Sequence, residues 1–296
     1  MTALPAFLSP VSPDPTIQEL CLDAEFPHPK LGASAHAYGN PGLVEFYTPF
    51  LTAIHDKCAR KISILAHGHL GIWPTVPRGG RYRDPSSISL TAQVETLHDA
   101  YPQAKLVITA HSMGCWVGLQ VLRAKPDLVS SLFLLFPTLS HINQTPNGRS
   151  LSWLFQAPLP RLISCVSILA WLLPLAALRL LFPEWPLPQI LVLRKFLHSP
   201  SAIYASLSLA DQEMKTIRDL DIALLQTYSH RLHMYFADED DWVGEQKGPV
   251  LRAFNADPGS VKIVHGHPDI PHAFCINHGE ELARQCFEWL QTGGLL

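Results

Sequence analysis

The chain has 296 residues, 47% of them hydrophobic, and a formal net charge of -3. This length is enough to bury one large core, and the weakly acidic balance excludes partners that need a strongly basic face, above all nucleic acids. Only 16% of the residues are charged, against about 25% in an average soluble protein, so the composition favours a protein that meets an apolar partner.

The N-terminal residues 1–15 are interrupted by prolines and lack the basic region of a signal peptide. The last residues, QTGGLL, carry no S-K-L or K-D-E-L address. Six cysteines are spread along the chain without any C-x-x-C spacing: Cys21, Cys58, Cys115, Cys165, Cys275 and Cys286. This spread argues against a disulfide framework or a zinc site and favours a reducing compartment.

Short apolar runs alternate with longer stretches of helical pattern along the chain. The expected strands are a weak one at Ala33–Ala37, then Lys61–Ala66, Lys105–Ala110, Val129–Phe136, Arg231–Ala237 and Val261–His265. The expected helices are Val44–Cys58, Leu90–Ala100, Met113–Ala124, Gln246–Phe254 and Asn277–Gln291. Strands that alternate with helices of this length predict an α/β protein with a mostly parallel sheet covered by helices on both faces.

Residues 38–43, which read YGNPGL, join the weak first strand to the first helix. Gly39 and Gly42 would let the backbone approach a bound substrate closely, and Pro41 fixes the turn. The backbone N–H of Asn40 is the best donor in such a loop. The alternative is a plain turn between a strand and a helix, since these residue types are common in turns.

Two His-Gly-His triplets, at 67–69 and 265–267, raise the question of a metal site. An H-x-H pair can chelate zinc, but no cysteine or carboxylate accompanies either triplet at ligand spacing. We therefore expect neither a metal nor a cofactor. His67 and His69 are expected to line a pocket or to organise the loop after their strand.

Residues 105–118 read KLVITAHSMGCWVG, an apolar strand that runs through a sharp turn into a helix. A nucleophile elbow needs this order, and it also needs small residues two positions before and after the nucleophile. Ala110, in place of the usual glycine, and Gly114 satisfy that requirement. An S-x-G sequence also occurs by chance, but the flanking strand and helix favour Ser112 as a nucleophile. The Met113 backbone N–H, at the helix N-terminus, would then stabilise an oxyanion.

The elbow predicts an α/β-hydrolase fold, and that plan places a second oxyanion donor in a loop after an early strand. The loop at 38–43 lies two strand–helix units before Ser112, so we expect the Asn40 N–H to be that donor. The chain is expected to be a single domain, residues 1–296, with an insertion at about 138–229 that has no strong strand signal. Insertions of this size often form a lid over the substrate site.

The middle of the insertion, Leu162–Phe182, is apolar apart from Arg179. Pro174 interrupts it, and its length is at the lower limit for a membrane span. Both ends of the insertion lead to strands of one sheet, so a single crossing of a membrane is excluded. The segment is expected to enter a lipid surface as a hairpin or to lie in the interface. The alternative is a lid buried over an acyl pocket.

The acid and the base should follow the nucleophile in the chain order serine, acid, histidine. The strand at 231–237 leads into four carboxylates, of which Asp240 is favoured because it lies deep enough in the loop to turn inward. Asp238 is the alternative, and the others are expected to be solvated or to cap a helix.

Three histidines follow the last strand: His265, His267 and His272. His265 lies on the strand and is expected to pack, and His267 is too close to the strand to reach far. His272 lies in a loop that opens toward the last helix, so it is the expected base. His272 would deprotonate Ser112, Asp240 would fix the imidazole tautomer, and water would hydrolyse the acyl-enzyme.

Several segments together resemble the lipid-droplet-associated hydrolases: YGNPGLVEFYTPFL, the first H-G-H triplet, AHSMGCWVGLQVL, LFPTLSHINQTPNGRSLSWLF, DQEMKTIRDLD and IPHAF. The PTLSHINQTPNGR segment is specific, because general hydrolases have no such sequence after that strand. The resemblance implies Ser112, Asp240 and His272 as the triad. It also implies an esterase or lipase-like enzyme on lipid droplets and the cytosolic face of the endoplasmic reticulum, with a sterol ester or acylglycerol as substrate.

Two other functions remain open on the sequence. The same triad would serve a soluble esterase or thioesterase of a specialised metabolite. A weakly active or non-catalytic droplet protein on a hydrolase scaffold is the third hypothesis, against which the three intact residues argue.

Overall fold

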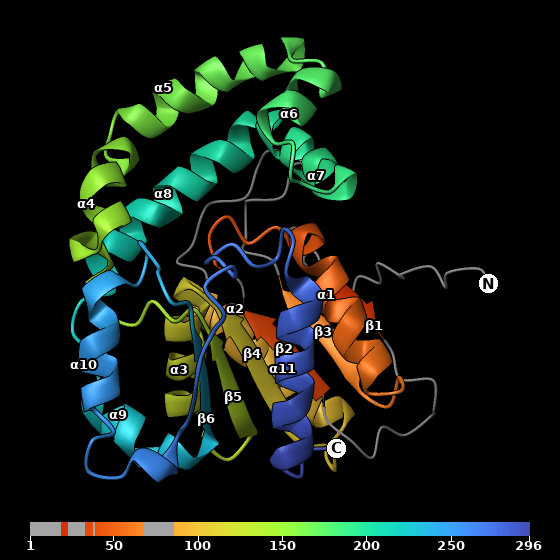
Figure 1. The fold of residues 1–296 in the computed structure, drawn as a ribbon, viewed down its shortest axis with the longest axis vertical. Coiled ribbons are helices and arrows are strands. Elements are labelled where there is room, and N and C mark those ends of the chain that lie inside the picture. The colour runs from red at the N-terminus through yellow and green to blue at the C-terminus, as the bar shows by residue number, and fades with distance from the viewer. Residues whose placement is uncertain (1–18, 23–32, 38, 68–85) are drawn as a thin grey trace.

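The computed structural model of the chain describes residues 19–22, 33–37, 39–67 and 86–296. Within them, seven strands form one sheet in the order β1-β3-β2-β4-β5-β6-β7 (Figure 1). The strands are β1 Glu19–Leu22, β2 Ala33–Ala37, β3 Ser63–His67, β4 Leu106–His111, β5 Val129–Leu135, β6 Leu232–Phe236 and β7 Lys262–His265. Every neighbouring pair is parallel except β1 with β3. The mostly parallel sheet that the alternation predicted is therefore confirmed.

Strand β1 is the one element of the described sheet that the sequence analysis missed. It has four residues and pairs antiparallel with β3, from Glu19 opposite His67 to Leu22 opposite Ile64. A strand this short carries almost no periodic signal in its sequence. It lies at one edge of the sheet, away from the strands that carry the predicted site.

The centre of the sheet is buried on both faces. All six residues of β4 and nearly all of β5 are buried, which is why both read as continuous apolar runs. Strand β7 lies at the opposite edge from β1, and His265 on it is exposed. The expectation that His265 packs is wrong, because an edge strand has a neighbour on one side only. The side chain of His67 and the whole of His69 lie outside the described residues.

Helices cover both faces of the sheet. Helices α1 (Val44–Lys57) and α11 (Gly279–Thr292) pack against each other on one face, and α2 (Ser86–Ala100) and α3 (Met113–Ala124) do so on the other (Figure 1). Each of them was expected, with ends within a few residues. Helix α10 (Lys247–Arg252), also expected, follows β6.

Helix α3 lies unusually close to the sheet at Gly118. A Cβ at this position would come 3.0 Å from Leu132 Cδ1 and 3.5 Å from the Cβ of Ala110. The missing side chain therefore lets α3 pack directly against β4 and β5, next to the turn that joins β4 to α3. Because this helix begins at that turn, its close packing also fixes the turn relative to the sheet.

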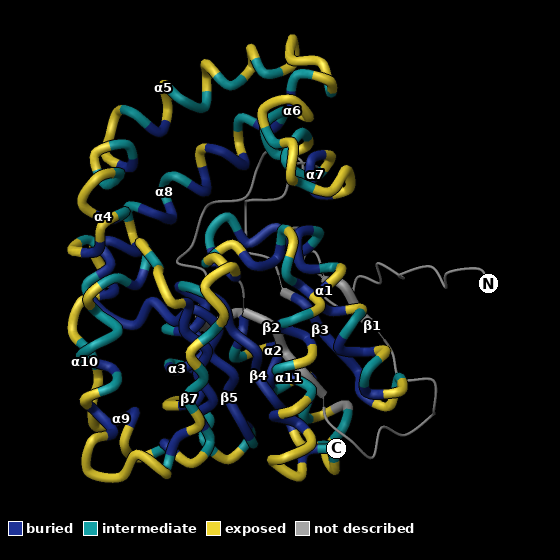
Figure 2. The backbone as a smooth tube through the Cα atoms, viewed as in Figure 1, coloured by how far each residue is buried: buried dark blue, intermediate teal, exposed yellow. Residues whose placement is uncertain are grey.

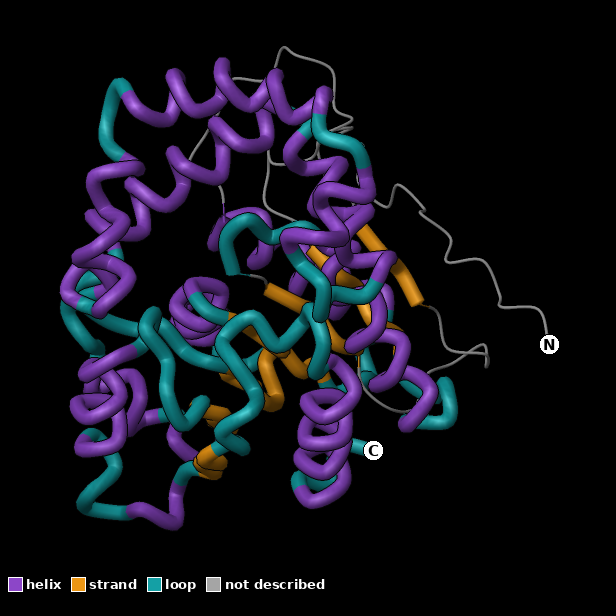
Figure 3. Tube along the Cα trace, turned by 45° about the horizontal axis from the view of Figure 1, so that its top comes forward, coloured by secondary structure: helices purple, strands orange, loops and turns teal. Residues whose placement is uncertain are grey.

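Between β5 and β6, the chain forms a helical lid and no strand, as expected. The lid helices are η1 Ile142–Gln144, α4 Pro146–Leu151, η2 Ser152–Phe155, α5 Leu159–Val166, η3 Ser167–Leu172, α6 Leu175–Leu181, α7 Leu187–Leu197, α8 Pro200–Thr216, α9 Ile222–Thr227 and η4 Ser229–Arg231. In Figure 3, the helices α4 to α8 lie over the loops at the carboxyl ends of the strands. The lid thus covers the edge of the sheet where loops from β2, β4, β6 and β7 meet.

The apolar segment at 162–182 is exposed along most of its length (Figure 2). Leu172 is 80% exposed and Leu180 is 82% exposed. Helix α5 continues directly into η3 at Ser167, and Leu173 and Pro174 separate η3 from α6. No single helix of the described residues is long and apolar enough to cross a membrane, although residues 146–155 and 159–172 meet that criterion as a pair bent by 79°.

Candidate active site

The turn between β4 and α3 holds Ser112 in a conformation that residues other than glycine rarely adopt. Its φ is 55° and its ψ is -127°, which costs about 1–3 kcal/mol in a side-chain-bearing residue. Hydrogen bonds hold the turn: the Ser112 N–H donates to Leu135 O at 3.0 Å, and its carbonyl accepts from Cys115 N at 3.0 Å and from Thr138 N at 3.3 Å. The strain is therefore stored in a turn fixed by both neighbouring elements.

The structure brings the three predicted site residues into one chain of hydrogen bonds. Ser112 Oγ lies 2.9 Å from His272 Nε2, and His272 Nδ1 lies 2.8 Å from Asp240 Oδ2. Because the carboxylate accepts from Nδ1–H, Nε2 of a neutral ring is left to accept from the Ser112 hydroxyl. This is the arrangement in which an imidazole can take up a proton from a serine.

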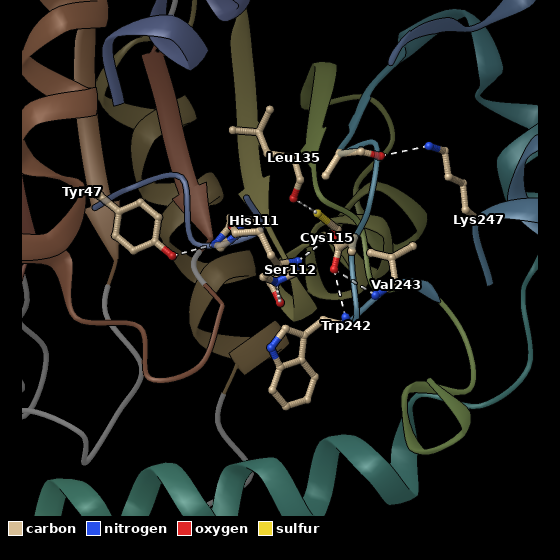
Figure 4. A network of polar contacts seen from close by, with 11 residues as sticks. Tyr47, His111, Ser112, Cys115, Leu135, Trp242, Val243 and Lys247 are labelled. Carbon is tan, nitrogen blue, oxygen red and sulfur yellow. Dashed lines mark hydrogen bonds and ion pairs between the residues drawn. The ribbon is translucent and has the colours of Figure 1, made fainter. Parts of the chain in front are cut away.

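Asp240 reaches this position through the loop after β6. Its Oδ1 accepts from the backbone N–H groups of Trp242 at 2.9 Å and Val243 at 3.1 Å (Figure 4). The side chain is only 6% exposed. Asp238, the alternative acid, is exposed together with Glu239 and Asp241, so three of the four carboxylates are solvated and one turns inward.

His272 lies in the loop between β7 and α11, with 16% of its side chain exposed. Its ring packs beside His111 and Phe136, with centroid separations of 5.0 and 5.8 Å. His267 lies outside this cluster, where it is exposed and faces Asp269 across 3.1 Å. The loop therefore selects one of the three candidate histidines.

A residue that sequence reasoning missed is His111, directly before the nucleophile. Its Nε2 lies 2.9 Å from the carbonyl oxygen of His272, and its Nδ1 lies 2.7 Å from the Tyr47 hydroxyl (Figure 4). A carbonyl only accepts, so Nε2 carries the proton and Nδ1 accepts from Tyr47. Burial, and the nearby His272, lower the pKa of His111 well below its usual range, so the ring is neutral.

Cys115 lies one turn below Ser112 but is not poised as a nucleophile. It is fully buried, and its Sγ lies 3.3 Å from Ala110 O and 3.5 Å from Leu135 O. Burial raises the pKa of this thiol well above its ordinary value. A protonated, enclosed thiol does not compete with the serine hydroxyl for a substrate.

The glycine-rich loop lies directly against the nucleophile. A Cβ at Gly39 would come 2.6 Å from Ser112 Cβ and 3.2 Å from its Oγ, so only glycine fits there. Gly42 has a φ of +67°, and Asn40 lies between these two glycines. Met113, on the other side of the nucleophile, is the first residue of α3, where a backbone N–H has no partner in its own helix. Both predicted oxyanion donors thus belong to segments that adjoin Ser112.

Two lid residues near Asn40 were also missed. The Asn40 side chain donates from Nδ2 to the carbonyl oxygen of Ser206 at 2.8 Å, and it lowers the pKa of the Glu213 carboxyl, which burial raises to about 8. Both residues lie on α8, far away in the sequence. No local motif could have revealed them, because the contact depends on how the lid docks.

Solved structures with this fold include esterases. The chain resembles a thermophilic esterase from Thermogutta terrifontis, with a TM-score of 0.61, 14% identity and coverage of 94% of this chain and 93% of the other. A carboxylesterase of Nitrososphaera gargenis matches with a TM-score of 0.62, 11% identity and coverage of 96% and 97%. These likenesses, with the parallel sheet and its flanking helices, show an α/β-hydrolase fold.

The sequence itself matches a family profile over most of its length. The profile described as lipid-droplet associated hydrolase matches residues 37–275. A curated protein of Mus musculus with the name lipid droplet-associated hydrolase is 24% identical over 284 residues, which cover 86% of this chain and 83% of that protein. The matched range includes every residue of the site described above.

Proposed function

Because this chain belongs to the lipid-droplet-associated hydrolase family, we propose that it is a serine ester hydrolase acting on neutral-lipid esters at the surface of lipid droplets. Sterol esters and acylglycerols are the proposed substrates. The proposed location also includes the cytosolic face of the endoplasmic reticulum. The observation that carries the chemistry is the 2.9 Å contact between Ser112 Oγ and His272 Nε2.

The proposed reaction proceeds through an acyl-enzyme. As Ser112 Oγ attacks the ester carbonyl carbon, His272 Nε2 takes the hydroxyl proton and later gives it to the leaving alcohol. The Asp240 carboxylate stabilises the imidazolium that forms between these steps. A water molecule, deprotonated in turn by His272, attacks the acyl carbon. The bond from this carbon to Ser112 Oγ then breaks, His272 returns the proton to Ser112 Oγ, and the fatty acid leaves.

The negative charge that develops on the carbonyl oxygen needs fixed donors. We assign this role to the backbone N–H groups of Asn40 and Met113, on opposite sides of the nucleophile. The close fit of Gly39 against Ser112 supports the first, since it brings that loop within reach of a bound ester. The helix N-terminus supports the second, because its partial positive charge favours an anion.

The lid supports the lipid surface as the place of action. Large apolar side chains are exposed over α5, η3 and α6: Leu162, Val166, Ile168, Leu169, Trp171, Leu172, Leu173, Leu180 and Leu181. Exposed apolar side chains gathered along one segment mark an interaction site in a water-soluble fold. We propose that this segment lies in the phospholipid monolayer of the droplet as an interfacial anchor.

Labelling with a fluorophosphonate probe tests the nucleophile. Wild-type protein is expected to be labelled and Ser112→Ala is not, because the probe reacts with a serine activated by a base. Ser150→Ala, at an exposed serine of the lid, is the matched control and should be labelled like wild type. Equal labelling of wild type and Ser112→Ala, or none of either, would favour a non-catalytic droplet protein.

A substrate panel tests the chemical class. Purified wild type and Ser112→Ala are compared on emulsified sterol esters, triacylglycerols, short soluble esters and acyl thioesters. The proposal expects Ser112-dependent release of fatty acid from at least one neutral lipid. Turnover confined to soluble esters or thioesters would instead identify a soluble esterase or thioesterase.

A further inference from the structure

The segment that opens the lid joins the nucleophile turn to the loop of the proposed acid. This opening segment is residues 137–149, which read PTLSHINQTPNGR, and the reaction described above gives it no role. At its start, the Thr138 N–H donates to the carbonyl oxygen of Ser112 at 3.3 Å. Near its end, the Asn147 N–H donates to the carbonyl oxygen of Asp241 at 3.0 Å. The opening segment is therefore hydrogen-bonded to both parts of the site.

Local contacts fix the shape of the opening segment. Thr145 Oγ1 donates to the carbonyl oxygen of Ile142 at 2.7 Å and accepts from the Gly148 N–H at 3.1 Å. A Cβ at Gly148 would come 1.8 Å from the same Ile142 oxygen, so only glycine fits there. Because its two halves are held together in this way, the segment can keep one part of the site in place relative to the other.

Pro146 of the opening segment lies against the turn that holds Asp240. In this turn, the N–H groups of Val243 and Gly244 donate to the carbonyl oxygen of Asp240 at 3.2 and 2.6 Å. A Cβ at Gly244 would come 2.7 Å from Pro146 Cδ, an atom that its ring fixes to the backbone. The turn and the segment are thus in close contact at this point, next to the start of α10 (Figure 1).

The middle of the opening segment makes two further contacts. Ser140 is only 2% exposed, and its Oγ donates to Gln246 Oε1 at 3.2 Å, at the far end of the loop of the acid. The N–H of His141 donates to the carbonyl oxygen of Arg218, directly after α8, at 2.9 Å. The opening segment thus holds the loop of the acid at three places and is itself held by the lid.

Resting on the role proposed above for Asp240, we propose that the opening segment positions the acid for the reaction. Pro146 and Ser140 keep the loop of Asp240 in place relative to the nucleophile turn, so that Asp240 Oδ2 lies 2.8 Å from His272 Nδ1. They are positioning residues, which act through Asp240 and take no part in the proton transfers. A displacement of about 1 Å in such a site can cost about 100-fold in rate.

The test measures kcat and KM on a short soluble chromogenic ester, with Ser112→Ala as the background. Gly244→Ala puts a methyl group against Pro146 Cδ and should push the turn of Asp240 out of place. We expect kcat to fall about 10-fold to 100-fold, with KM within about 3-fold, because the acid stabilises the reacting imidazole and does not bind the ester.

Gly294→Ala is the matched control. Gly294 has a φ of +60°, close to the +52° of Gly244, but nothing lies within 4 Å of an added Cβ. This variant imposes the same backbone strain without a collision, so it should keep the kcat of wild type. A loss of kcat in Gly294→Ala as large as in Gly244→Ala would overturn the proposal.

A second substitution tests whether the contact with Pro146 causes the loss. Pro146→Ala removes the Cδ atom that the new methyl group meets, so adding it to Gly244→Ala should recover most of the lost kcat. If the double variant is as slow as Gly244→Ala alone, the contact does not position the turn and the proposal is wrong.

The Asp240→Asn background separates positioning of the acid from a general loss of structure. If the opening segment acts through Asp240, Gly244→Ala should lower kcat no further once the carboxylate has been replaced. A defect that is independent of the acid would instead multiply the two losses. An additional loss of about 10-fold or more in this background would therefore contradict the proposal.

Ser140→Ala makes the same test without introducing a collision. It removes the hydrogen bond to Gln246, so kcat should fall about 3-fold to 10-fold in otherwise wild-type protein and should not change in the Asp240→Asn background. This variant keeps the proposal testable if Gly244→Ala does not fold. An unchanged kcat in Ser140→Ala would then overturn it.

The two proposals fail in different ways. If Asp240→Asn has the kcat of wild type, the proposed role of the acid is wrong. If Asp240→Asn loses kcat while Gly244→Ala and Ser140→Ala behave like wild type, the proposed chemistry stands and only the positioning role of the opening segment is wrong.

Discussion

At the scale of single residues, hydrogen bonds hold the side chains of the site in one orientation each. Asp240 has both oxygens engaged, one by two backbone N–H groups and one by His272. His111 has both ring nitrogens engaged, one by Tyr47 and one by the carbonyl oxygen of His272. His272 is thus held at two points: Asp240 binds its ring, and His111 binds its backbone carbonyl.

Asp240→Asn tests the acid. The amide can still occupy the loop, but it no longer stabilises an imidazolium or fixes the tautomer with Nδ1 protonated. We expect kcat to fall about 10³-fold to 10⁴-fold, with the thermal midpoint nearly unchanged. Asp238→Asn, at the exposed alternative two residues earlier, is the control and should have the kcat of wild type. A larger loss at Asp238 than at Asp240 would reverse the assignment.

Tyr47→Phe tests the support behind the base. The change removes the donor to His111 Nδ1 and leaves a buried acceptor without that partner, which costs about 1–3 kcal/mol. We expect a lower thermal midpoint and a lower kcat, because the backbone of His272 is held through the same ring. Tyr204→Phe, at a tyrosine that is 40% exposed, should change neither quantity. An unchanged kcat in Tyr47→Phe would mean that the His111 ring does not position His272.

At the scale of elements, the lid has an inner surface that faces the rest of the protein and an outer surface that is exposed and apolar. The inner face of α8 is buried, and Ser206 on it accepts a hydrogen bond from Asn40 in the loop before α1, whereas α5, η3 and α6 expose large apolar side chains. The proposed lipid contact and the hydrogen bond to the glycine-rich loop thus belong to one helical assembly. Because the outer helices are proposed to contact lipid, the apolar segment at 162–182 does not need to be buried in the protein.

A triple variant, Trp171→Ser, Leu172→Ser and Leu180→Ser, tests the outer surface. These side chains are 62%, 80% and 82% exposed, so the fold should tolerate the change while transfer into lipid becomes unfavourable. We expect flotation with phospholipid-coated oil droplets to be lost and kcat on a soluble ester to remain. Ile222→Ser, an exposed apolar residue of α9 outside this segment, should still float. Undiminished flotation of the triple variant would show that this surface is not the anchor.

At the scale of the whole molecule, the parallel sheet brings distant parts of the chain together. Loops after β2, β4, β6 and β7 open at the same edge because these strands run in the same direction. The order of the sheet puts β4 between β2 and β5, so the nucleophile lies between the glycine-rich loop and the start of the lid. The lid then covers the edge at which all these loops meet.

The sequence by itself determined the inner strands, the helices that flank the sheet and the candidates for the reaction. Ser112 could be predicted because a tight turn with small neighbours is a local requirement, and the inner strands because continuous apolar runs follow from burial on both faces. Asp240 and His272 could be predicted because the order of the chain and the ends of the strands limit the choice to a few residues. The catalytic roles remain predictions, although the structure brings all three side chains together.

Only the tertiary structure decided what depends on contacts between distant segments. His265 is exposed because β7 lies at an edge, and β1 is a strand because β3 is available to pair with it. The neutral ring of His111 and the buried Glu213 acquire their properties from residues far away in the sequence. The physical reason is that burial and hydrogen bonding set the charge of such groups, and both arise only when the lid and the loops pack together.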